Sequence, residues 1–193
     1  LLETLNTPAY KIASFELCDL PLIKYIAEKG KPIIMSTGLS SESEINDALK
    51  TARNNGCKDI ILLHCISSYP APAEESNLLQ IKELSRRYEL PIGLSDHTLG
   101  TTVALTSIAL GACVIEKHFI LDRSEKGPDS DFSIEPSELK SLCNQAEIAW
   151  KSLGKASFKI QKSEKDNMVF RRSIYFIKDL PKGHILKKDD IKR

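Results

Sequence analysis

Two histidines stand at the ends of two short apolar runs. The run PIGLSDH ends at His97, and the run VIEKHF carries His118 beside its last residue. Neutral imidazole is a common ligand of divalent metal ions, and two such ligands leave coordination positions open for other molecules. A histidine at a strand end is also often a hydrogen-bonded structural residue. The spacing alone leaves both interpretations open.

Hydroxyl and charged side chains follow other apolar runs in the same way. The residues of this kind that could bind a substrate or an anion are Ser14, Glu16, Ser36, Ser67, Tyr69 and Ser95. Hydroxyl groups at strand ends also cap helices, so a structural role is the alternative. Lys11 opens an apolar run and either lies at a rim or faces inward as a partner for phosphate. His64 comes one residue before the end of its run, so alternation predicts that it points away from the others.

Five apolar runs alternate with helical patterns along the chain. These runs predict short buried strands at residues 10–14, 32–37, 60–65, 92–97 and 114–119. Between them, Ser41 and Glu44 have the spacing of a capping box at a helix start, and Gly30 and Gly56 suit helix ends. The alternation predicts a right-handed parallel α/β fold.

Two parallel α/β architectures are compatible with this alternation. A doubly wound sheet usually carries a glycine-rich ligand loop after its first strand, and the chain has no G-x-G-x-x-G motif. A TIM barrel instead places polar residues at the carboxyl ends of many strands, and it needs eight strands. We therefore expect part of a TIM barrel, in which all the polar strand ends meet at one mouth.

The overall composition is that of a globular protein. With 27% charged residues and a net charge of +1, the chain has no sign of a nucleic-acid partner or of a membrane-surface partner. No apolar run approaches the roughly 20 residues that cross a bilayer. The five cysteines contain no CxxC pair. We expect most of them to be small buried apolar residues in a reducing cytoplasm.

Six motifs along the chain resemble one enzyme family. The sequence is similar throughout to the sialic acid synthases, the phosphoenolpyruvate-dependent synthases of nine-carbon acidic sugars, in YKIASFE, KPIIMSTGLS, LLHCISSYPAP, GLSDHTLG, GACVIEKHF and GPDSDFSIEP. Within the family, KIASFE, LDRSEKGPDSDFS and FRRSIY look most like the pseudaminic acid synthases. Sialic and legionaminic acid synthases more usually read KIGSGE or KIPSGE at the first motif, and often have a histidine at the position of Ser130. N-acetylneuraminate or legionaminate synthase is the alternative.

The resemblance implies a reaction and a set of residues for it. Phosphoenolpyruvate would condense with an open-chain N-acetylated amino sugar and release phosphate, with Mn²⁺ or Mg²⁺ as cofactor. His97 and His118 match the two protein ligands of the metal, and Asp129 joins them as a catalytic residue near the sugar. The positions that match phosphoenolpyruvate-binding residues are Lys11, Ser14, Ser36, Ser67 and Ser95. Those around the sugar are Glu16, Tyr69 and Asp129.

A Schiff-base aldolase is the rival enzyme class for such a barrel. It needs a lysine at the centre of the barrel. Lys117 is next to His118, so it alternates to the outer face if His118 points inward. The pattern therefore disfavours an aldolase of this type.

The resemblance also divides the chain. Residues 1–153 match the C-terminal part of the TIM-barrel synthase domain, with strands 4–8. Residues 154–170 would be a linker, and residues 171–193 the beginning of a small antifreeze-like (SAF) domain. The full-length parent is expected to be a cytoplasmic homodimer. Residues 1–193 alone are expected to be inactive, because part of a barrel leaves two open sheet edges. A truncated chain without catalytic activity is thus the alternative to a synthase.

Overall fold

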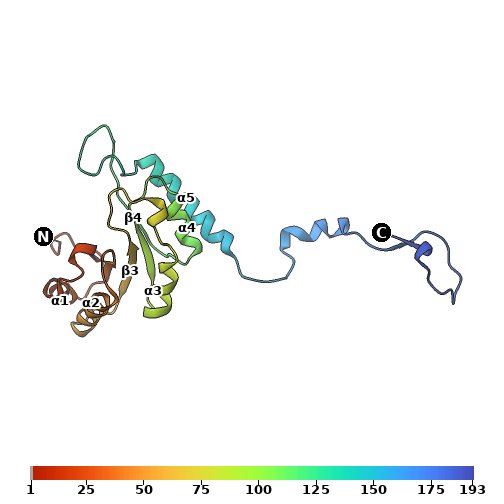
Figure 1. Ribbon diagram of the computed structural model, residues 1–193, viewed down its shortest axis with the longest axis horizontal. Coiled ribbons are helices and arrows are strands. Elements are labelled where there is room, and N and C mark those ends of the chain that lie inside the picture. The colour runs from red at the N-terminus through yellow and green to blue at the C-terminus, as the bar shows by residue number, and fades with distance from the viewer. Residues whose placement is uncertain (1) are drawn as a thin grey trace. The chain divides into compact units, whose positions relative to one another are not determined.

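The computed structural model describes residues 2–193, which form two units. The first unit ends at Gly154, and the second spans Lys155–Arg193 (Figure 1). Among the helices of the described residues, none is long and apolar enough to cross a membrane. All the candidate site residues belong to the first unit.

The first unit is built on a parallel sheet of five strands that pair in the order of the chain. They are β1 (Tyr10–Ile12), β2 (Ile33–Ser36), β3 (Ile60–Cys65), β4 (Ile92–Asp96) and β5 (Ile115–Lys117). With a helix after each strand, they form a half-barrel, which confirms the predicted α/β fold and partial TIM barrel. Most strands are shorter than the predicted runs, because ladder pairing stops where the chain turns into the loops that carry the polar residues.

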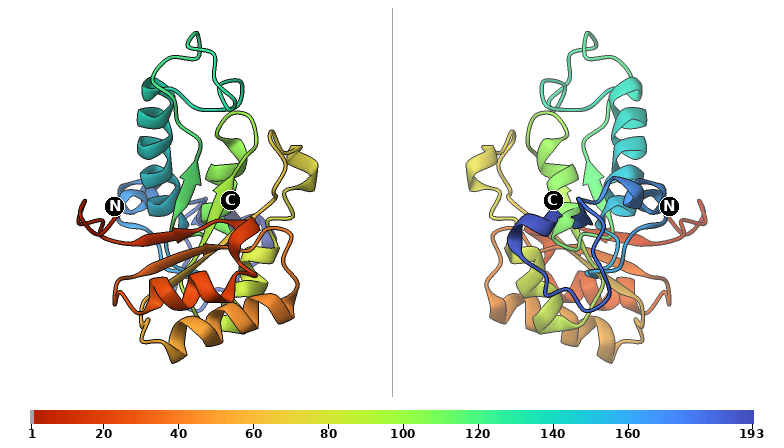
Figure 2. Two further views of the ribbon diagram at one scale, coloured as in Figure 1. Left: turned by 90° about the vertical axis from the view of Figure 1, so that its left-hand side faces the viewer. Right: turned by 90° about the vertical axis from the view of Figure 1, so that its right-hand side faces the viewer.

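Helices cover one face of this sheet, and Figure 2 shows α1 and α2 side by side below the strands. The helices are α1 (Leu20–Ala27), α2 (Glu42–Asn54), α3 (Gln80–Tyr88), α4 (Thr102–Ala109) and α5 (Pro136–Leu153). Asp19 Oδ1 accepts a hydrogen bond from Leu22 N at the start of α1. Ser41 and Glu44 cap each other's backbone N–H at the start of α2, as predicted from their spacing.

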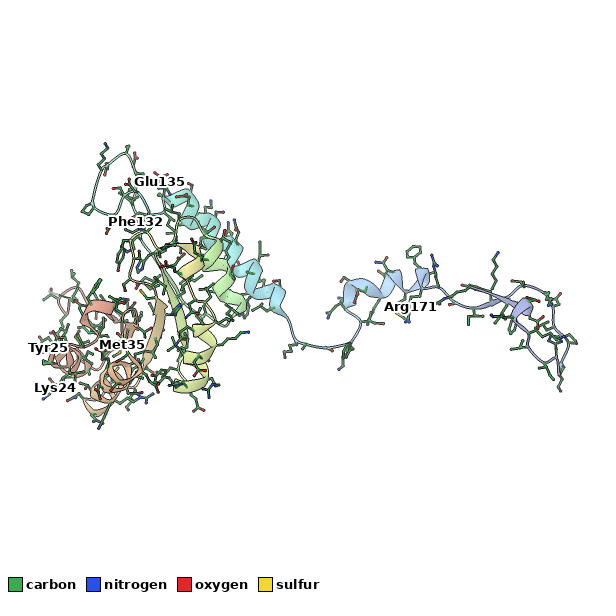
Figure 3. The ribbon with its side chains drawn as sticks, in the orientation of Figure 1. Lys24, Tyr25, Met35, Phe132, Glu135 and Arg171 are labelled. Carbon is green, nitrogen blue, oxygen red and sulfur yellow. The ribbon has the colours of Figure 1, made fainter. Side chains whose placement is uncertain are left out.

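Side-chain alternation along the strands sends one set of apolar residues towards the helices. Ile12, Ile33, Leu62 and Ile92 are almost fully buried there, against leucine and isoleucine side chains of α1, α2 and α3. Met35 of β2 lies in the same core (Figure 3). Because alternate residues point to the other face, the polar residues between these positions share the concave side of the half-barrel.

The second unit contains little regular structure. It has a 3₁₀ helix, η3 (Lys162–Phe170), and one antiparallel pair, β6 (Tyr175–Phe176) with β7 (Ile191–Lys192). The helix η3 falls inside the range that was expected to be a linker.

Asp190 organises the turns around that strand pair. Its buried carboxylate accepts hydrogen bonds from Lys187 N and from His184 Nε2, each at 2.7 Å, and pairs with Lys178 Nζ at 2.5 Å. Lys178, followed by the Lys187 N–H and His184, holds the pKa of this carboxyl well below its ordinary value. This one side chain thus links the segments around Lys178, His184 and Lys187.

The expectation that most cysteines are buried is wrong. Cys57 and Cys65 are buried, but Cys18, Cys113 and Cys143 are exposed. Cys18 follows the short 3₁₀ turn η1 (Ser14–Glu16), and Cys113 precedes β5, so neither lies inside a buried element. Cys143 is on the side of α5 that faces away from the core.

The core predicts a specific stability effect. Leu62→Ala removes a fully buried side chain from the centre of the sheet and leaves a cavity, so we expect a loss of about 2–5 kcal/mol in the free energy of unfolding. Urea unfolding of the complete protein measures it. The matched control is Leu79→Ala, because Leu79 is exposed and should change that free energy by about 0.5 kcal/mol or less. Equal effects of the two substitutions would contradict the core described above.

Candidate active site at the carboxyl edge of the sheet

The two histidines found in the sequence lie beside each other. Their ring centroids are 5.2 Å apart, His97 just after β4 and His118 just after β5. The backbone of each is anchored by another segment of the chain: Ala71 N donates to the His97 carbonyl oxygen, and Ile134 N donates to that of His118. The predicted meeting of two strand ends is therefore present.

An oxygen acceptor orients each imidazole through its Nδ1 atom. His97 Nδ1 is 2.8 Å from the carbonyl oxygen of Ile66, and His118 Nδ1 is 3.4 Å from Asp129 Oδ2. A carbonyl or carboxylate oxygen can only accept, so Nδ1 carries the hydrogen in a neutral ring and Nε2 keeps its lone pair. Metal-binding histidines are usually held in this way. The donor set thus fits a divalent metal ion.

The number of ligands is small. In the part of the chain that the structure describes, no group of three or more histidine, cysteine, aspartate and glutamate side chains is placed to hold a metal ion. Two imidazoles would leave the remaining positions of an ion to other molecules.

The two histidines differ in their pKa. Burial lowers the pKa of His97, but its contacts with Cys65 and with the Ile66 carbonyl oxygen outweigh burial, and the pKa lies above the ordinary value. Burial and the neighbouring His97 hold the pKa of His118 below its ordinary value, against the opposing effect of Asp129. One proton on the pair therefore belongs on His97.

Aromatic side chains pack against the two histidines. The Tyr69 ring centroid is 4.3 Å from that of His97 and 5.7 Å from that of His118. The ring centroid of Phe132, which precedes α5 (Figure 3), lies 4.9 Å from that of His118 and 5.9 Å from that of Tyr69. Tyr69 could be predicted from the sequence, whereas Phe132 could not, because no local pattern marks a residue of the long loop before α5.

A network of hydrogen bonds joins three of the predicted anion-binding residues. Lys11 Nζ donates to Ser36 Oγ at 2.9 Å, and Ser95 Oγ donates to Glu116 Oε1 at 2.7 Å. Lys11 Nζ is also 3.5 Å from that same Glu116 oxygen. Lys11 thus faces the concave side and does not point away at the rim; these were the two alternatives for its side chain. Glu116 was missed, although its two-residue spacing from His118 places it on the same face.

Ser14 and Ser67 form a second group around a buried thiol. Ser14 Oγ donates to Cys65 Sγ at 3.4 Å, and Ser67 Oγ lies 3.7 Å from the same sulfur. Gly38 makes room for both hydroxyls, since a Cβ there would lie 2.3 Å from Ser67 Oγ and 2.8 Å from Ser14 Oγ. The two hydroxyls therefore approach one point through a glycine that the sequence analysis did not single out.

Three further residues lie outside these groups. Glu16 Oε2 accepts a hydrogen bond from Ala13 N within its own turn. His64 Nε2 lies 2.7 Å from the Ser76 carbonyl oxygen, on the helix side of the sheet, as alternation predicted. Lys117 also points to that side, where it pairs with Asp96.

The comparisons with known proteins agree on one family. A profile of the NeuB family matches residues 1–158 of the chain. The chain belongs to the NeuB family. This membership confirms the resemblance that the six motifs indicated.

Two curated relatives of the NeuB chain have names that state a product. The chain is 44% identical to the N,N'-diacetyllegionaminic acid synthase of Campylobacter jejuni over 99% of its length, and 42% identical to the pseudaminic acid synthase of Helicobacter pylori over 100%. It covers 58% and 57% of those two proteins.

A solved structure supports the fold. The N-acetylneuraminic acid synthetase of Leptospira borgpetersenii, crystallised with citrate, superposes with a TM-score of 0.80 at 38% identity. The match covers 88% of the NeuB chain and 59% of that protein. The half-barrel is thus the same arrangement of strands and helices as in an N-acetylneuraminic acid synthetase.

The histidine pair yields a prediction about proton binding. In the metal-free complete protein, we expect His118 to titrate at a lower pH than His97. Burial lowers the pKa of His118, and so does the positive charge of the neighbouring His97 once it is protonated. In His97→Gln, the pKa of His118 should rise towards its ordinary value. NMR titration of the imidazole signals measures both. A His118 pKa that is unchanged in this variant would contradict the electrostatic link between the two rings.

Proposed function

We propose that this chain supplies the metal site and most of the phosphoenolpyruvate site of a synthase that makes a nine-carbon acidic sugar. The main support is that the Lys11 network and the histidine pair lie on the same face of the sheet. Ser95 in β4 is two residues from His97, which follows that strand, and Glu116 in β5 is two residues from His118, which follows β5. The Lys11 network and the histidine pair therefore open on the same concave side. A cation site beside a cradle for an anion suits the joining of phosphoenolpyruvate to a carbonyl compound.

The histidine pair would bind Mn²⁺ or Mg²⁺ through the two Nε2 atoms. When bound, such an ion supplies Lewis-acid polarisation of the aldehyde oxygen of the sugar. The contacts of Nδ1 with Ile66 and Asp129 would keep both rings turned towards the ion.

Lys11, Ser36 and Ser95 would bind the phosphate and carboxylate groups of phosphoenolpyruvate. An ammonium group and hydroxyl donors are suitable partners for these oxyanions. Lys11 and Ser95 now donate towards Glu116, which shows that a carboxylate fits between them. Ser14 and Ser67, held together by Gly38, would add two more hydroxyls at the side of the same pocket.

Asp129 and Tyr69 would contact the amino sugar. Asp129 lies against His118, where its free oxygen can accept from a sugar hydroxyl group. The Tyr69 ring packs on both histidines and, with Phe132, would limit the access of water to the reacting atoms. Glu16 would contact the sugar as well, through the carboxylate oxygen that Ala13 N does not bind.

The reaction would proceed in two bond-forming steps. The enol carbon of phosphoenolpyruvate attacks the aldehyde carbon, the π electrons of the aldehyde pass to its oxygen, and that oxygen takes up a proton and becomes a hydroxyl group. The new carbon–carbon bond leaves a cationic centre at the carbon that carries the phosphate. Water adds to that carbon and loses a proton, and the carbon–oxygen bond to phosphate then breaks, so that phosphate leaves and the remaining hydroxyl group loses its proton to give a ketone. The residues of this chain bind and orient the two substrates so that the reacting carbons meet.

The remainder of the synthase would lie in other segments of the protein. The chain spans 57–58% of the length of the two curated relatives described above. Among the described residues, β1 and β5 each pair with one strand, which leaves an edge free for further strands of the barrel. We propose that these strands complete the barrel, that residues 171–193 begin an antifreeze-like (SAF) domain after a linker at 154–170, and that the complete protein is a homodimer.

The product that we favour is pseudaminic acid. The motifs KIASFE, LDRSEKGPDSDFS and FRRSIY support it. Legionaminic acid is the second candidate, because the chain is as similar to a legionaminic acid synthase as to a pseudaminic acid synthase. The deciding experiment incubates the complete protein with phosphoenolpyruvate and each candidate amino sugar, including N-acetylmannosamine. Phosphate release and the mass of the product identify the substrate, and no release with any sugar would overturn the proposal.

The metal assignment predicts the effect of removing either ligand. We expect His97→Ala and His118→Ala to abolish synthase activity and to weaken Mn²⁺ binding, because each removes one of two protein ligands. Activity and calorimetric Mn²⁺ titration measure the change. His64→Gln is the matched control, since His64 is a buried histidine of the same sheet that points to the helices. Mn²⁺ affinity that is equally weak in all three variants, or unchanged in both alanine variants, would sink the assignment.

The anion cradle predicts a selective change in Michaelis constants. Lys11→Met keeps most of the side-chain stem and removes the charge, so the Michaelis constant for phosphoenolpyruvate should rise about 10-fold or more, as expected from the loss of a charge-assisted hydrogen bond of about 1.5–3 kcal/mol. The constant for the sugar should change much less. Lys24→Met, on the exposed side of α1, is the control and should leave both constants as they are. Lys11 is an ordinary rim residue if its two constants move together.

A further inference from the structure

A buried ion pair lies directly beside the histidine pair. Lys117 Nζ donates to Asp96 Oδ2 at 2.8 Å, and the two side chains are 3% and 1% exposed. Asp96 immediately precedes His97 in the chain, and Lys117 immediately precedes His118. The two residues are also direct partners in the register of β4 and β5. The ion pair thus joins the last paired positions of the two strands that carry the histidines.

Thr98 completes the contacts of this pair. Asp96 Oδ1 accepts from Thr98 N at 2.9 Å and from Thr98 Oγ1 at 2.8 Å. Lys117 Nζ donates its second hydrogen bond to the Thr98 carbonyl oxygen at 2.7 Å. The side chains of Asp96 and Lys117 therefore hold the residues on both sides of His97 as well as the strand that leads to His118.

The ion pair acts from the far side of the sheet. Alternation directs Asp96 and Lys117 towards the helices, while their neighbours Ser95 and Glu116 pair on the concave side. Glu116 is exposed by 41% and can exchange partners, whereas the outer pair is out of reach of water and of any substrate. Of the two contacts, the Asp96–Lys117 ion pair is thus the fixed one. It supports the two histidines without touching a ligand that they bind.

Stability alone is a poor reason for such a pair. The free-energy cost of removing two charges from water is about as large as the gain from their attraction. Proteins with apolar residues of similar size at such positions are often at least as stable. What the pair adds is a fixed geometry, because a lysine with two acceptors and a carboxylate with three donors allow few alternative arrangements.

We propose that Asp96 and Lys117 are positioning residues for the histidine pair. Their ion pair sets the separation and direction of the two imidazoles, and thereby the affinity of the site for a divalent cation. This inference rests on the proposed function, which assigns His97 and His118 to one metal ion. The alternative is that the pair only stabilises the fold, in which case metal affinity would follow stability.

Three variants of the complete protein separate these two roles. Lys117→Met leaves the Asp96 carboxylate buried without its cation, and Asp96→Asn leaves the Lys117 ammonium without its anion. The double variant Asp96→Asn with Lys117→Met has no buried charge. The dissociation constant for Mn²⁺, measured by electron paramagnetic resonance of the free ion without substrates, is compared with the midpoint of urea unfolding.

We expect the Mn²⁺ dissociation constant to rise about 10- to 100-fold in each single variant, as is usual when a residue that orients metal ligands is replaced. In the double variant, the unfolding midpoint should recover, because no charge is left unpaired. The dissociation constant should stay high, since the contact that fixes the two strand ends is still missing. If a single variant fails to fold, the double variant alone carries the test.

Ile33→Ala is the matched control. Ile33 is fully buried on the same helix side of the sheet, but on β2 and far in the sheet order from the two histidines. It should lower the unfolding midpoint and leave the Mn²⁺ dissociation constant roughly unchanged. A wild-type dissociation constant in the double variant, or a similar rise in Ile33→Ala, would overturn the positioning role.

The failure of the inference and the failure of the proposed function look different. If the wild-type protein binds Mn²⁺ and His97→Ala weakens it, but the double variant binds like the wild type, only the positioning role is wrong. If His97→Ala and His118→Ala leave Mn²⁺ binding unchanged, the metal assignment is wrong and the positioning role is overturned with it.

Discussion

The first unit depends on one constraint, the alternation of side chains along five parallel strands. Residues such as Ile33 and Leu62 enter the helix-covered core, and their neighbours are left on the concave face. Since all the strands run in the same direction, the last residues of each meet at one edge. A shift of register by one residue in β4 would bury His97 against the helices and turn Asp96 to the concave face. The chemistry of the site is therefore tied to the register of the sheet.

Charged residues at this edge of the sheet differ in their exposure to water on the two faces. Asp96 and Lys117 are buried and fully engaged with each other and with Thr98. Lys11 and Glu116 are partly open to water and can be approached by a ligand. The buried pair gives rigidity, which a metal site needs, whereas the open pair gives exchangeable partners, which an anion site needs. The two pairs meet at β5, where the adjacent residues Glu116 and Lys117 point to opposite faces of the sheet.

Much of this arrangement could be predicted from the sequence, because it depends on local periodicity. The apolar runs located all five strands, and alternation placed His64 and Lys117 on the outer face and the two histidines together. What depends on contacts distant in the chain could not be predicted. Gly38 follows β2 and makes room for Ser14 and Ser67, which follow β1 and β3. Phe132 reaches the site because a long loop folds back on His118. The burial of the cysteines was misjudged for the same reason, since an apolar neighbourhood in the chain is not a buried position in space.

The contact between Lys11 and Glu116 has a geometric meaning of its own. Lys11 lies on β1 and Glu116 on β5, the first and last strands of the sheet, and yet their charged atoms are 3.5 Å apart. The two side chains thus bridge the concave side of the half-barrel from its first strand to its last, with one positive and one negative group. An anion that binds Lys11 competes directly with this contact. The ammonium group of Lys11 can therefore either bind an anion on the concave side or link the two edge strands.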